Sequence, residues 1–323
     1  MLIALEQLNR KLNDTLTDRG FTSEEAATVG APILWAVTHG NNQGLLKLVH
    51  EPSLKKKSSL RAMSVLKQTS CSIWIDGGEN NGMLVMQDAV YKAKSLLKGS
   101  PIAVIGIRGM RSSCGALAYF TEQLASDGYV ALMLGRTPPM VAPFGSIEAL
   151  FGTNPIAISF PTNQEPVTFD MATSAIAYYG LVLAAAEGKE VDPTAVIDAL
   201  GNPTSDPALV MKEGKILPFD RTYKGSSIGM LVELLSGPLV GGGFCNTEGE
   251  WGNLIIGLDP DMFVGKAQFK DSATAMIEKL HSAKTKNGKV RLPGDRAREF
   301  YTQVKRDGAV DIPDKVLEKL GWN

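Results

Sequence analysis

The sequence is poor in the residues that build metal centres and disulfide frameworks. Its 323 residues include only three cysteines and three histidines. The cysteines are widely scattered, and no two histidines have the spacing of metal ligands, so neither a disulfide framework nor a metal site is expected. Reduced thiols of this kind favour a cytoplasmic location.

Long apolar runs and a surplus of one charge are also missing. No run is long enough to span a bilayer, and the first residues lack the basic-then-apolar pattern of a signal peptide. The net charge of -1 gives no reason to expect nucleic acid or an anionic membrane as a partner. The remaining composition, 44% hydrophobic and 21% charged, is typical of a soluble enzyme of one large or two smaller domains.

The usual glycine fingerprint of dinucleotide-binding proteins is absent, although the surrounding pattern is that of an α/β fold. An apolar strand is expected at 102–107, a glycine-bearing loop at 108–115, a helix after it and a strand at 129–134. The loop contains no G-x-G-x-x-G. It follows the carboxyl end of a strand, where α/β proteins usually bind ligands.

Two helices open the chain, and the second ends on a histidine. Leucines at helical spacing predict a helix over 5–16, and Thr22 with Glu25 forms a capping box for a second helix that runs to Thr38. His39 therefore lies at a helix C-terminus, where the helix dipole stabilises an imidazolium. That position suits a proton donor, and it equally suits a histidine that only caps the helix.

A carboxylate lies at a predicted strand-to-helix junction in the middle of the chain. Strands are expected at 156–160 and 167–169, followed by Asp170 and a helix over 175–187 that Thr173 and Ser174 would cap. Free backbone N–H groups beside a carboxylate can bind phosphate or hold a reacting group. A capped helix beside a structural aspartate is the alternative.

Lys224 immediately precedes another predicted helix, at 228–235. A cation at a helix N-terminus opposes the helix dipole, which hints that this lysine serves a ligand. Beyond it, the sequence predicts a buried strand at 254–258 and helices over 272–282, after 295 and over 313–320.

Seven motifs are spread over nearly the whole chain: His39-Gly40, 106–115, 141–145, 151–155, 169–174, 223–225 and 292–295. Together they resemble the type-2 malate/L-lactate dehydrogenase family. That family includes malate, sulfolactate and ureidoglycolate dehydrogenases, diketogulonate reductase and the cyclic ketimine (piperideine/pyrroline carboxylate) reductases.

The resemblance implies a nicotinamide-dependent oxidoreductase with a non-classical NAD(P)-binding fold. It implies a central mixed-sheet α/β domain over residues 66–269 and a helical domain formed by both termini, 1–65 and 270–323. It also implies a homodimer whose active site lies between domains. The cofactor is NAD or NADP, and the substrate is a small molecule.

The resemblance also assigns roles to individual residues. His39 corresponds to the family's proposed proton donor, oriented by Thr38 and Asp170, and a carboxylate beside it would raise its pKa. Asn154 would help to hold cofactor or substrate. The residues implied to line the cofactor are Thr137, Phe169, Asp170, Met171, Ala172, Thr173, Ser174, Tyr223, Lys224, Gly294 and Asp295.

Three positions depart from the family pattern. Gln43 stands where the family commonly has an arginine that would bind the substrate carboxylate, Ser113 where some members have a second histidine, and Tyr223 where a further histidine is usual. Arg111 or Arg136 could replace the lost positive charge, and Arg136 is also a candidate contact for the adenine ribose. Cys114 is interpreted as a packed thiol.

Three functions follow from these observations. The first is interconversion of a small 2-oxo acid and its L-2-hydroxy acid, with His39 exchanging the proton. The second is reduction of a cyclic imine acid, which needs fewer arginines and is consistent with Gln43. The third is a degenerate member of the family that binds a dinucleotide without turnover.

Overall fold

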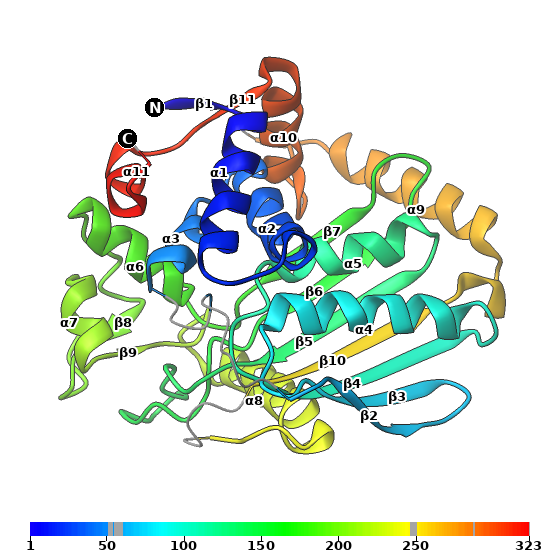
Figure 1. The fold of residues 1–323 in the computed structure, drawn as a ribbon, viewed down its shortest axis with the longest axis horizontal. Helices are drawn as coiled ribbons and strands as arrows, with labels where there is room; N and C mark the ends of the chain where they lie inside the picture. The colour runs from blue at the N-terminus through cyan, green and yellow to red at the C-terminus, as the bar shows by residue number, and fades with distance from the viewer. Residues whose placement is uncertain (51–53, 55–60, 246–250, 287, 323) are drawn as a thin grey trace.

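The computed structural model describes residues 1–50, 54, 61–245, 251–286 and 288–322, with the side chains of Gln43 and His50 left out. A seven-stranded sheet in the order β2-β3-β4-β10-β5-β6-β7 forms its centre (Figure 1). Only β3 and β4 are parallel within this sheet, so the predicted mixed sheet is confirmed. The strands are β2 Ser64–Gln68, β3 Ser72–Asp76, β4 Ile102–Met110, β5 Val130–Arg136, β6 Ile156–Phe160, β7 Val167–Met171 and β10 Trp251–Leu258.

Helices cover both faces of the sheet because its central strands are apolar on both sides. α4 (Gly82–Leu97) and α5 (Leu117–Ser126) pack on one face against alternate residues such as Ile105 and Ala131. α8 (Tyr223–Ser236) packs on the other face against Leu134 and Leu254. Near-continuous apolar strands are typical of sheets buried in this way.

Helices from both ends of the chain share a second core, and in Figure 1 the blue and red segments lie together. β1 (Leu2–Ala4) pairs with β11 (Ala309–Asp311), which ties the two ends to each other. This confirms the predicted helical assembly of both termini, while the division at residues 65 and 270 stays a prediction. The helices are α1 Leu5–Asp18, α2 Ser23–Thr38, α3 Gln43–His50, α10 Asp295–Asp307 and α11 Asp314–Leu320.

Three predicted helix starts are wrong, since α8 begins at Tyr223 rather than at 228 and α9 (Lys266–His281) at Lys266 rather than at 272. The helix after β7 is α6, Tyr178–Glu187, and it begins three residues later than expected, with Ala177 as its N-cap. Thr173 and Ser174 do not cap it, because their hydroxyls donate to the carbonyls of Thr153 and Ile176. Short polar side chains stabilise turns as readily as helix ends, and here the turn prevails.

The remaining elements are short strands, 3-10 turns and helices. They are β8 Val196–Ile197, α7 Pro207–Lys212, β9 Lys215–Ile216, the 3-10 turns Pro238–Val240 and Pro260–Met262, and α9 Lys266–His281. Within the described part of the chain, no helix has the length and apolar character needed to cross a lipid bilayer.

Candidate active site

Two adjoining cavities lie between the sheet and the helical assembly. The large cleft has a volume of about 930 Å³ and includes His39, Glu122 and Gly294 in its wall. The small cavity has a volume of about 600 Å³ and includes Lys47, Thr137 and Trp251. Three residues border both spaces, namely Asn41, Ala116 and Asp170. The predicted His39 and Asp170 thus share the wall of one cleft, and Asp170 stands where the two spaces meet.

His39 ends α2 and lies between two aromatic rings. Its imidazole stacks at 4.0 Å on Trp35 and at 4.3 Å on Tyr301, measured between ring centroids. Nδ1 lies 2.6 Å from the carbonyl oxygen of Trp35 and 3.3 Å from the hydroxyl of Thr38. A carbonyl can only accept, so Nδ1 carries the proton and Nε2 of the neutral ring keeps the lone pair.

The predicted effect of Asp170 on His39 is wrong. Burial lowers the pKa of His39, and the nearby positive charge of Lys305 lowers it further. In the part of the chain that the structure describes, no hydrogen bond joins His39 to Asp170. The tautomer of His39 is therefore set by the Trp35 carbonyl, with Thr38 beside it, and a neutral ring is favoured near pH 7.

Asp170 lies at a helix N-terminus, as expected, but the helix is α5 rather than the one that follows it in sequence. Its Oδ2 accepts a hydrogen bond of 2.9 Å from the backbone N–H of Ala118, in the first turn of α5. The Asp170 side chain is exposed where it borders the two cavities. Desolvation by the surrounding protein raises the pKa of its carboxyl to about 6, against the opposing effect of the Ala118 and Leu117 amides. A carboxyl that titrates near neutrality is suited to acid–base chemistry.

Lys47 is a site residue that the sequence analysis missed. It lies in α3, is only 8% exposed, and borders the small cavity. Its Nζ donates to the Ser113 hydroxyl over 2.6 Å and lies 4.0 Å from the centre of the Tyr179 ring. The signal available in the sequence was a single lysine within the otherwise apolar run 44–49. Lysine usually lies on an exposed face, so its place in such a run marks it as a candidate for burial.

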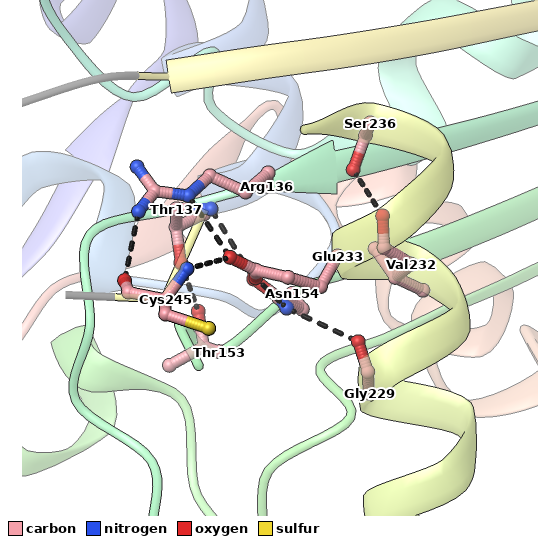
Figure 2. Close-up of polar contacts among 9 residues, drawn as sticks. All are labelled: Arg136, Thr137, Thr153, Asn154, Gly229, Val232, Glu233, Ser236 and Cys245. Atoms are coloured by element: carbon pink, nitrogen blue, oxygen red, sulfur yellow. Dashed lines mark hydrogen bonds and ion pairs between the residues drawn. The ribbon is translucent and has the colours of Figure 1, made fainter. Parts of the chain in front are cut away.

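Arg136 and Asn154 belong to a buried polar cluster outside both cavities. Figure 2 shows Glu233 of α8 between them, with Oε1 3.3 Å from Nε of Arg136 and Oε2 2.6 Å from Nδ2 of Asn154. The Asn154 amide also bonds to the backbone of Thr137 and Gly229. Arg136 is fully buried and ion-paired, so the prediction that it supplies the missing charge or holds the adenine ribose is wrong. Asn154 can position Thr137, but a direct contact with substrate does not follow.

The other predicted ligand-binding residues divide into two groups. Thr137, Met171 and Ala172 border the small cavity, and Gly294 borders the large cleft. Neither space is bordered by Arg111, Phe169, Thr173, Ser174, Tyr223, Lys224 or Asp295, while the Gln43 side chain lies outside the described residues. Asp295 instead accepts hydrogen bonds from the ring of His281 and from the backbone of Leu292.

The large cleft is rich in positive charge on the side formed by the C-terminal segment. Arg291, Arg296, Arg298 and Lys305 border it there. Glu122 also borders this cleft, where it accepts a hydrogen bond from the Trp35 indole, and burial raises its pKa. Guanidinium groups bind phosphate oxygens well, so this donor set fits the pyrophosphate of a dinucleotide.

Cys114 behaves as the packed thiol that was expected. It is 5% exposed, and burial raises its pKa to about 11, so the thiol is neutral at physiological pH. A neutral, enclosed thiol is a poor nucleophile.

Comparison with known proteins gives one family. Residues 3–321 match the model of the malate/L-lactate dehydrogenase family. The L-sulfolactate dehydrogenase of Methanothermobacter thermautotrophicus is 28% identical over 333 residues, 99% of this chain and 95% of that protein. The Delta(1)-pyrroline-2-carboxylate/Delta(1)-piperideine-2-carboxylate reductase of Pseudomonas syringae pv. tomato is 37% identical over 250 residues, 72% of this chain and 70% of the reductase.

Solved structures agree with this result. Malate dehydrogenase from Entamoeba histolytica has a TM-score of 0.91 at 19% identity, covering 99% of this chain and 96% of that one, which establishes the fold alone. The delta1-piperideine-2-carboxylate reductase of P. syringae has a TM-score of 0.86 at 28% identity, covering 99% and 98%. Another relative is named ureidoglycolate dehydrogenase (NAD(+)), from Escherichia coli K12, 28% identical over 337 residues, 99% of this chain and 95% of that protein.

Proposed function

Because the chain belongs to the malate/L-lactate dehydrogenase family, we propose that it is an NAD(P)-dependent oxidoreductase that interconverts a small 2-oxo acid and its L-2-hydroxy acid. Its relatives are dehydrogenases and reductases, and the protein is an oxidoreductase like them. The observation that carries the proposal is the place of Asp170, which borders both a dinucleotide-sized cleft and a smaller cavity.

The large cleft is the proposed cofactor site. Arg291, Arg296, Arg298 and Lys305 would hold the phosphates, and the backbone at Gly294 would lie against the nucleotide. When bound, the nicotinamide supplies or takes up the hydride. The small cavity then holds the substrate, with its reacting carbon at the junction beside Asp170.

Asp170 is the proposed group that exchanges a proton with the substrate. With a pKa of about 6 it can give a proton to a developing alkoxide oxygen and take one from a hydroxyl. His39 borders the large cleft but not the small cavity, so we assign it the next position in the proton route, with Nε2 as the exchanging atom. The sequence had assigned the direct exchange to His39.

The test is a spectrophotometric assay of NADH and NADPH oxidation. Pyruvate, 2-oxobutyrate and oxaloacetate form the 2-oxo acid panel, and the reverse reaction uses the corresponding L-hydroxy acids. Turnover with at least one pair supports the proposal. Calorimetric binding of either dinucleotide without turnover of any substrate would instead show a degenerate member of the family.

A second candidate function is reduction of a cyclic imine acid. It is favoured by the P. syringae relative, which reduces such imines by name. It needs no second carboxylate-binding group in the site. A higher kcat/KM for piperideine-2-carboxylate than for pyruvate would select it, and the reverse order would discard it.

We also propose a homodimer in which α8 supplies part of the interface. α8 exposes Ile228, Leu231 and Leu234 at helical spacing, and Leu239 and Phe244 follow at 64% and 56% exposure. Such a patch is unusual on a free surface. Leu234→Glu should convert the dimer to a monomer in light scattering, whereas Leu200→Glu, at an exposed leucine outside α8, should not.

A reducing cytoplasmic compartment suits the three free cysteines.

A further inference from the structure

Lys47 has a position that the proposed function does not yet use. A lysine is rarely buried unless its charge serves or meets another group, because desolvating an ammonium is costly. Here α3 delivers Lys47 into the wall of the small cavity with 8% exposure. The Tyr179 ring, 4.0 Å from Nζ, and the Ser113 hydroxyl, 2.6 Å from it, hold the ammonium in place.

The Ser113 hydroxyl is also fixed by hydrogen bonds. Its Oγ accepts from Nζ of Lys47 and, over 3.2 Å, from the backbone N–H of Gly115. These two bonds occupy the lone pairs of the hydroxyl, which leaves its O–H to act as a donor. An ammonium with a neighbouring O–H donor at the wall of a cavity is a binding site for a carboxylate.

The rest of the small cavity limits what a substrate can carry. Among the described residues that border it, Lys47 and Asp170 are the charged ones. Much of the wall is apolar or aromatic, as with Ile33, Met140 and Trp251. A second anionic group on the substrate would therefore find no further cation among these residues, and beside Asp170 it would meet a carboxyl, which is unfavourable.

We propose that Lys47, held by Ser113, anchors the single carboxylate of the substrate, and that the enzyme therefore prefers 2-oxo or cyclic 2-imino monocarboxylates with a small apolar body. The inference rests on the proposed function for the reaction itself. It adds that a second carboxylate or a sulfonate is selected against. Lys47 thereby takes over the charge that a Gln43 side chain cannot provide.

The test compares Lys47→Met with the wild-type enzyme on pyruvate, piperideine-2-carboxylate and oxaloacetate. Loss of a buried charge-assisted hydrogen bond should raise KM for the monocarboxylates about 10- to 100-fold. KM for oxaloacetate should rise as well, because its 2-oxo carboxylate uses the same anchor. The preference for monocarboxylates that the cavity wall sets should therefore persist, while Lys47→Arg should restore part of the lost affinity. Lys266→Met is the matched control, because Lys266 also lies 4.0 Å over a tyrosine ring but outside both cavities.

A binding measurement keeps the inference testable without turnover. Calorimetry with L-pipecolate, a cyclic monocarboxylate, and with its carboxamide should show a preference for the carboxylate in the wild type and in Ser113→Ala a weaker one. Loss of that preference in Lys47→Met, at an unchanged melting temperature, supports the anchor. Equal binding of acid and amide by the wild type, or an unchanged ratio in Lys47→Met, overturns it. Failure of every substrate with both cofactors would overturn the proposed function instead.

Discussion

Two groups of charged side chains in this protein are built differently. In the cluster of Figure 2, the Arg136 guanidinium is ion-paired with the carboxylate of Glu233, and the Asn154 amide donates a hydrogen bond to the other carboxylate oxygen. In the wall of the small cavity, Lys47 is held by a hydroxyl and an aromatic ring, and Asp170 by backbone amides. The first arrangement pairs opposite charges away from both cavities, whereas the side chains of the second border the cavities. Position relative to the cavities thus separates a structural cluster from a candidate reactive one.

The largest effect on kcat is expected from replacing the titrating carboxyl of Asp170. Asp170→Asn keeps an oxygen for the Ala118 amide, so the fold is retained, but it cannot exchange a proton. We expect kcat to fall about 100- to 10,000-fold, as for loss of a general acid or base. Steady-state assays against pH provide the measurement, and unchanged kcat at every pH would exclude the assigned role.

Asp170→Asn should lower kcat but raise the thermal stability of the protein at high pH. The folded chain holds the Asp170 proton more tightly than the unfolded chain does, since its pKa is raised from 3.8 to about 6. Unfolding then releases a proton, so this group costs stability increasingly as pH rises through that range and by a constant amount above it. Asp170→Asn should therefore melt at a higher temperature than the wild type at pH 8 and at nearly the same temperature at pH 4. A lower melting temperature at pH 8 would contradict the burial argument.

Breaking the structural cluster should affect folding before chemistry. Glu233→Gln leaves the Arg136 guanidinium buried without its carboxylate, which should cost about 3–5 kcal/mol of the free energy of unfolding. Urea titration measures this. Glu299→Gln, which removes an exposed carboxylate paired with Lys289 and Arg291, should leave the stability nearly unchanged. Equal effects of the two variants would mean that the cluster is not neutralised as described.

His39 should have a smaller effect on kcat than Asp170. His39→Phe keeps the stack between Trp35 and Tyr301 and removes both ring nitrogens. We expect a decrease in kcat of about 10- to 100-fold, together with loss of a titration below the ordinary histidine pKa. A decrease larger than that of Asp170→Asn would reverse the order proposed for the proton route.

The smallest effect is expected at Thr38. Thr38→Val removes one of two oxygens near Nδ1 of His39 and leaves the Trp35 carbonyl in place. The loss of one neutral hydrogen bond corresponds to about a five-fold change in kcat. Thr38→Ser should restore the wild-type value, and if it does not, the hydroxyl is not the relevant group.

Local signals in the sequence predicted much of the fold and part of the site. The capping box of Thr22 and Glu25 is present, and α2 ends next to His39 as expected, because both depend on residues close in sequence. The partner of Asp170 was not predictable in this way. β7 lies at the edge of the sheet beside α5, so its carboxyl meets amides more than fifty positions earlier in the chain.

Lys47 and Arg136 show the same limit of signals that are local in the sequence. Lysine and arginine carry the same charge, and nothing close to them in the sequence says which groups they contact. Packing places Arg136 against Glu233 and Lys47 against Ser113, and both contacts join positions more than sixty residues apart. The predicted start of the helix after β7 was wrong for a related reason, because the hydroxyls of Thr173 and Ser174 donate hydrogen bonds to carbonyls in a turn.

The hydrogen bond between the Asp170 carboxyl and the first turn of α5 also provides a spectroscopic probe. The Ala118 amide donates to an oxygen whose charge disappears when the carboxyl takes up a proton. Its nitrogen and proton resonances should therefore move with pH around the carboxyl's midpoint, in a spectrum recorded without substrate or coenzyme. Isotope-labelled protein would thus report the ionisation of this one group directly, residue by residue, before any reaction has been identified.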